Sequence, residues 1–161
     1  FDPDFTGIGN QPHFFDEWTA IYKRYLVTAV DLTITFSPGW NTSGSDRATG
    51  CGYYISNVTG SPPGSGLIEN PGLAEELYVP NDKTVVVKRH IKLNEVVGLT
   101  MAEYKGANSR MYGKDTTNPQ EIIRLWVRAA RIGAGTNVEC PYKVQMQFHC
   151  EFSDMKNVAQ S

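Results

Sequence analysis

The chain has no long apolar run, few cysteines and no surplus of basic residues. Its 161 residues include 15 Lys and Arg against 17 Asp and Glu, a formal net charge of −2. A membrane helix needs about 20 consecutive apolar residues, and neutralising a phosphate backbone needs an excess of Lys and Arg. We therefore expect a soluble protein without a membrane partner, whose charge alone does not indicate nucleic-acid binding.

The three cysteines do not form a disulfide framework. Cys51 stands alone, and Cys140 and Cys150 have the same parity on what we predict to be one strand. Ten residues of extended chain separate two Cα atoms by about 33 Å, whereas a disulfide requires about 7 Å or less. There is also no CxxC pair. We expect reduced thiols in an intracellular setting.

The short motifs that mark catalytic and cofactor sites are absent. The sequence contains no GxSxG, no HExxH and no Walker loop. His13, His90 and His149 lie far apart in the sequence, and none has a second ligand at the spacing of metal-binding motifs. We therefore expect no enzyme activity, no cofactor and no metal site.

Hydrophobic alternation predicts strands along much of the chain. Residues Tyr25–Phe36 are nearly all apolar, β-branched or aromatic, and their second half alternates with a period of two. Tyr142–Phe152 alternates in the same way over a longer stretch. Shorter β-rich runs occupy Gly50–Thr59 and Thr84–Leu93. Together these patterns predict a sheet protein.

One segment, Glu121–Ile132, fits both a helical face and a strand face. We assign it as a strand, because the GAGTN turn at Gly133–Asn137 could connect it to an antiparallel neighbour. Helix is expected only in short pieces. One is Asp16–Tyr22, capped by Asp16, and another is a turn that starts at Asn70 and runs to Tyr78.

Many strands, long loops and little helix predict an all-β fold over residues 1–161: a single jelly-roll β-sandwich of eight antiparallel strands. A chain of this length can bury one sizeable core. The side chains expected in that core are Leu32, Ile34, Phe36, Val144, Met146 and Phe148. The loops expected to contact neighbouring molecules are 37–50, 60–80, 111–120 and 133–140.

Taken in order, three stretches resemble the capsid proteins of circoviruses and related small circular single-stranded DNA viruses. FDEWTAIYKRYLVTAVDLTITFSPGW, residues Phe15–Trp40, is similar to that family's entry into the first jelly-roll strand. RLWVRAARIG at Arg124–Gly133 and YKVQMQFHCEF at Tyr142–Phe152 resemble the family's last two strands. The resemblance therefore covers both ends of the chain and brackets its middle.

The resemblance implies a structural coat protein without a catalytic site. Such a protein self-assembles as a homo-oligomer into a small icosahedral shell around a single-stranded DNA genome. It is found in the virion, and in the host nucleus or cytoplasm during assembly. The family also carries an arginine-rich N-terminal arm that binds the genome, and this arm has no counterpart here. Because the chain begins at Phe1, we expect that an upstream basic segment has been lost.

A basic pair among aromatic residues is the candidate nucleic-acid contact. Lys23 and Arg24 stand between Tyr22 and Tyr25. Aromatic rings stack on bases while cations neutralise phosphates, so this combination suits single-stranded nucleic acid. The segment also lies near the point where the basic arm would join.

A second group of residues is the candidate subunit interface. It comprises Trp40, Arg124, Trp126 and Arg128. As strand residues, Arg124 and Arg128 share a face with Trp126, where they could meet phosphates or the acids of a neighbouring subunit. The alternative is a solvated face on which the arginine stems partly cover Trp126.

The alternative function is a secreted, lectin-like jelly-roll module that binds carbohydrate. Asn41-Thr42-Ser43 and Asn57-Val58-Thr59 match the N-glycosylation pattern. Such a module would use Trp40, Tyr53 and Tyr54 as a platform for a sugar ring. Assembly discriminates the two functions, because a lectin stays a small oligomer whereas a shell protein forms large closed particles.

Overall fold

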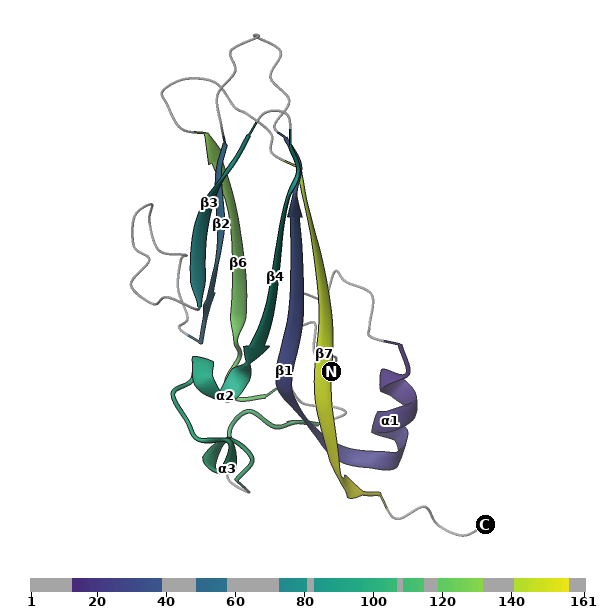
Figure 1. Ribbon diagram of the computed structural model, residues 1–161. Helices are drawn as coiled ribbons and strands as arrows, with labels where there is room; N and C mark the ends of the chain where they lie inside the picture. The colour runs from purple at the N-terminus through teal and green to yellow at the C-terminus, as the bar shows by residue number, and fades with distance from the viewer. Residues whose placement is uncertain are drawn as a thin grey trace. The chain divides into compact units, whose positions relative to one another are not determined.

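The computed structural model describes residues 13–38, 49–57, 73–80, 83–106, 109–114, 119–131 and 141–156. These ranges form seven strands and three short helices (Figure 1). The strands belong to two sheets, one of four strands and one of three. The predicted all-β class is therefore confirmed, with seven strands in the described ranges. No helix among these residues is long and apolar enough to cross a membrane.

The four-stranded sheet is organised around β1, Tyr22–Phe36. Its neighbours are β4 (Val85–Lys92), the two-residue β5 (Gly113–Lys114) and β7 (Tyr142–Met155). The long alternating runs of β1 and β7 favour strands, because alternate side chains reach opposite faces of a sheet. The first and last of the described strands are thus paired.

The three-stranded sheet has the order β3-β2-β6 and is antiparallel throughout. Its strands are β2 (Thr49–Ser56), β3 (Ala74–Val79) and β6 (Arg124–Arg131). The strand assignment of Glu121–Ile132 is confirmed. The expected pairing of this strand with the last one is wrong, because β6 pairs with β2 and β7 pairs with β1.

Contacts divide the chain into two compact units. Unit 1 comprises residues 1–30, 91–122 and 147–161, and unit 2 comprises residues 31–90 and 123–146. Strands β1, β4 and β7 contribute residues to both units.

The core of unit 2 is formed by the apolar side chains of its strands that face inward. Leu32, Ile34 and Phe36 of β1 are buried as expected, because every second residue of the strand faces inward. The other buried apolar side chains of this unit are Cys51, Tyr53, Ile55, Ala74, Val79 and Val87. Each large apolar side chain removed from water contributes about 1.5–3 kcal/mol to folding.

The last strand is less covered than expected. Met146 is 42% exposed, so its assignment to the core is wrong, and Val144 and Phe148 are only half-buried. The alternation of β7 is present, since Gln145 and Gln147 between them are exposed. The exposure of these side chains follows from the position of β7 in the sheet. Among the described strands β7 pairs with β1 alone, and its apolar row is only partly covered.

The core of unit 1 is rich in aromatic rings. Phe15 meets Tyr25 edge-on, with ring centroids 5.1 Å apart. Phe152 of β7 contacts Phe15, Trp18, Tyr22 and Tyr25. Phe15 is therefore buried in unit 1 and Trp18 packs on Phe152 with one face, whereas Phe14 is largely exposed.

The helices differ from expectation in detail. Helix α1 spans Phe15–Ile21, but Asp16 is not its cap, because the N-cap is Phe14 and no side chain caps this end. The helical turn expected from Asn70 to Tyr78 is wrong, since residues 74–79 form β3 in register with β2.

Two further helices were not expected. They are α2 (Leu93–Val96) and α3 (Met101–Tyr104). Helix α3 begins with a capping box in which Thr100 and Glu103 bond reciprocally.

Candidate functional site

The segment proposed for nucleic-acid contact opens β1, and its tyrosines are drawn into the fold. The ring of Tyr25 is buried against Phe15, so it is not available to stack on a base. Tyr22 is half-buried between Trp18 and Phe152. The aromatic part of this candidate site therefore serves mainly to pack unit 1.

The two cations of this segment have different roles. The Nε of Arg24 donates to the Asp154 carboxylate at 2.5 Å, and the guanidinium lies 5.4 Å from the centre of the Tyr112 ring. These contacts neutralise Arg24 and hold it in place. Lys23 is exposed, so it is the member of the segment that remains open to a phosphate.

The candidate subunit interface lies on the face of the β3-β2-β6 sheet that does not form the core. Trp126 stands directly opposite Tyr54, and Val127 opposite the buried Tyr53. Directly opposite residues share a face, so Trp126 and Tyr54 lie together on the outer face, where both are half-buried. This placement fits a contact surface better than a core position.

The other interface residues are placed less fully. Arg124 is half-buried at the start of β6, and its Nη1 is buried without a hydrogen-bond partner among the described residues. Arg128 belongs to β6, but its side chain lies outside the described part of the structure. Trp40 lies outside the described residues altogether.

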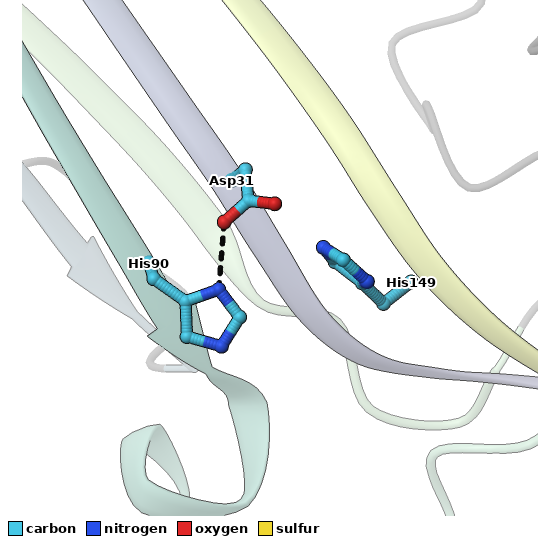
Figure 2. Close-up of side chains that lie close together, drawn as sticks. All are labelled: Asp31, His90 and His149. Atoms are coloured by element: carbon cyan, nitrogen blue, oxygen red, sulfur yellow. Dashed lines mark hydrogen bonds and ion pairs between the residues drawn. The ribbon is translucent and has the colours of Figure 1, made fainter.

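An acid and a histidine that are remote in sequence meet in unit 2. His90 Nδ1 and Asp31 Oδ1 lie 2.6 Å apart, and both side chains are about half exposed (Figure 2). Sequence spacing does not reveal this pair, because 59 residues separate its members and only the pairing of β4 with β1 brings them together. The pair by itself forms an ion pair when His90 is protonated.

His149, also drawn in Figure 2, belongs to unit 1. There its backbone oxygen accepts a hydrogen bond from Thr28 Oγ1 at 3.1 Å. This contact links β7 to β1 near the middle of both strands.

A polar network ties β4 to the three-stranded sheet inside unit 2. Arg89 donates to the Tyr53 hydroxyl at 3.2 Å through Nε and to Glu75 at 2.6 Å through Nη2. Burial raises the pKa of the Tyr53 hydroxyl, so it stays protonated. Tyr53 therefore faces inward and cannot belong to the sugar platform of the alternative function.

The described cysteines, Cys51 and Cys150, lie in protected positions. Cys51 is buried, and burial raises the pKa of the Cys150 thiol to about 11. A thiol is nucleophilic only as the thiolate, so Cys150 is not activated. Chemically, the residues of the candidate sites described above offer ionic and aromatic contacts.

No protein-family model, curated protein or solved structure matches this chain.

Proposed function

We propose that this chain is a viral coat protein with an eight-stranded jelly-roll fold, which self-assembles into a small icosahedral shell around a single-stranded DNA genome. The observation that carries the proposal is the nesting of strand pairs. Among the described strands, the first pairs with the last, β1 with β7, and the second pairs with the one before last, β2 with β6. A jelly roll, which is a long antiparallel hairpin wound into two sheets, pairs its strands in this order.

The surface of the chain also suits repeated assembly. A monomeric protein rarely exposes large contiguous patches of apolar side chains unless a partner covers them. The exposed ones among the described residues are Phe14, Trp18, Ile21, Tyr78, Val86, Leu99, Tyr142, Met146 and Met155. Many contacts of modest size can together close a shell.

Genome binding in this proposal depends mainly on an arm upstream of Phe1. The chain itself has a net charge of −2 and cannot neutralise a phosphate backbone. Lys23, exposed at the start of β1, is the contact that this domain would add. The shell would be found in the virion, after assembly in the host nucleus or cytoplasm.

The test is to purify the chain and examine it by negative-stain electron microscopy, with size-exclusion chromatography and light scattering. Uniform spherical particles support the coat-protein proposal. If the chain stays a monomer or small oligomer, the experiment is repeated with an arginine-rich arm fused before Phe1 and a single-stranded oligonucleotide added. Absence of particles in that second experiment as well overturns the proposal.

The lectin-like alternative retains one supporting observation. Tyr54 and Tyr78 lie on the outer face of the β3-β2-β6 sheet, and Tyr78 is largely exposed. Aromatic rings on an open sheet can stack on sugar rings. A glycan screen read by thermal shift tests this alternative, and a sugar that stabilises a non-assembling chain would favour it over the coat protein.

A further inference from the structure

A cluster of charged and aromatic side chains lies in unit 1, where β5 pairs with the start of β1. Arg24 and Lys114 are directly opposite one another across the two strands, so their side chains lie on the same face of the sheet. Tyr112 and Asp154 both contact Arg24. All four residues belong to unit 1, and we call them the Arg24 cluster.

The guanidinium of Arg24 is fixed in its orientation. Its Nε donates to Asp154 Oδ2 at 2.5 Å, and its Cζ lies 5.4 Å from the centre of the Tyr112 ring. The Tyr112 hydroxyl in turn donates to the Lys105 backbone oxygen at 3.0 Å, which anchors the ring. A charged group that is ordered before its ligand arrives loses little conformational freedom on binding.

Arg24 keeps hydrogen-bond donors even though Asp154 neutralises its charge. A guanidinium carries five N–H donors, and within the described part of the chain only the Nε–H of Arg24 is bonded. Its Nη1 and Nη2 groups have no partner there, and the side chain is 34% exposed, so part of it is open to a ligand. Parallel N–H donors of arginine match two oxygens of a phosphate group.

Lys114 adds a positive charge to the same face. Its side chain is exposed and has no ion-pair partner in the described ranges. Like charges directly opposite in a sheet repel each other, so Lys114 and Arg24 together favour an anion near them. The cluster holds two cations and one carboxylate, which leaves one positive charge over. Each phosphodiester of a nucleic-acid strand carries one negative charge, whereas free phosphate is more highly charged at neutral pH.

We propose that Arg24 and Lys114 together bind one phosphate of single-stranded DNA, and that Asp154 and Tyr112 orient Arg24 for this contact. The Nη groups of Arg24 donate to the phosphate oxygens, and the Lys114 ammonium supplies the charge that balances the phosphate. This inference rests on the proposed coat-protein function, which supplies the single-stranded genome. It adds a second contact to the one at Lys23. Phosphate contacts carry no sequence information, so binding here is independent of base sequence.

Oligonucleotide binding tests the contact. The full chain is titrated into fluorescein-labelled oligothymidine, and the dissociation constant is measured by anisotropy at several salt concentrations. We expect Lys114→Glu to weaken binding about tenfold, and Lys114→Ala to lower the slope of log Kd against log salt by about 0.7, because one phosphate contact to a single strand is lost. Oligoadenosine should show the same changes, since the contact reads no base.

Two further variants separate this contact from a general effect of charge. Arg24→Lys keeps the positive charge but removes the planar fork, so it should weaken binding without changing the salt slope. Lys143→Glu and Lys143→Ala make the same charge changes at an exposed site of β7 and should leave both values nearly unchanged. Circular dichroism and the thermal midpoint check that each variant is folded.

The contact is overturned if Lys114→Glu binds the oligonucleotide as tightly as Lys143→Glu, or if the original chain does not bind it at low salt. Competition by inorganic phosphate that removes all binding at the same phosphate concentration also overturns it, because the site would then take free phosphate. Particle formation is scored separately by electron microscopy, so shells without binding that depends on Lys114 leave the coat proposal standing. Binding that depends on Lys114, in a chain that forms no particles even with the arm restored, supports the contact while the coat proposal fails.

Discussion

Replacing Gly113 by alanine should destabilise unit 1, because an aromatic ring occupies the space that a Cβ would need. Gly113 of β5 lies directly opposite Tyr25 of β1. A Cβ built on Gly113 would stand 2.3 Å from the Tyr25 Cζ, far inside van der Waals contact. Tyr25 is buried, so its ring has no open space into which it can swing.

Two effects oppose each other in this variant. Overpacking a buried site costs about 1–3 kcal/mol, while replacing glycine by alanine stabilises by about 0.4–1 kcal/mol through the unfolded chain where the backbone permits it. The clash dominates, so we expect the free energy of unfolding to fall by about 0.5–2.5 kcal/mol. For a chain of this size that corresponds to a drop in Tm of about 1–10 °C.

Urea unfolding, followed by tyrosine and tryptophan fluorescence, measures this loss. The matched control is Gly113→Ala in a Tyr25→Leu background, where the shorter side chain leaves room for the new methyl group. We expect the alanine to cost little in that background, so the two changes should be strongly coupled. An unchanged midpoint for Gly113→Ala alone would refute the packing argument.

Three further outcomes are expected. Tyr104→Phe removes the 2.8 Å hydrogen bond that the buried hydroxyl donates to the Val27 oxygen, and urea unfolding should show a loss of about 1–2 kcal/mol. Burial raises the Cys150 pKa from 9.0 to about 11, so the protonated thiol contributes stability below pH 9 that is lost as the pH rises through 11, and Cys150→Ala should lose less over this range. Under the proposed coat-protein function, Trp126→Ser should fold, judged by its thermal midpoint, but form no particles in electron micrographs, whereas Asn41→Ser should leave both unchanged.

Periodicity along the chain predicts the strands well because it is a local property. Leu32 and Ile34 face a core as their alternation indicates, and β1, β2, β4 and β6 lie close to their expected positions. Exposure of Met146 could not be predicted in the same way. It depends on how many strands cover β7, and that number is fixed by pairing between distant parts of the chain.

The candidate sites show the same division between local and distant information. The basic pair Lys23 and Arg24 is visible in the sequence, but the partner that neutralises Arg24 is Asp154, 130 residues away. His90 and Asp31 likewise meet only through strand pairing. Local patterns thus identify which residues carry charge, and the topology decides which of those charges are already satisfied.

The pairing of the first strand with the last has a consequence for synthesis of the chain. Thr28 bonds to His149 across 121 residues, and Arg24 bonds to Asp154 across 130. Contacts so distant in sequence make folding slow, since a large loop must close before they form. β1 is synthesised before β7 and must wait for it with most of one edge unpaired. Newly made chains are most prone to aggregate in the interval between synthesis of β1 and synthesis of β7, and chaperones would act in that interval.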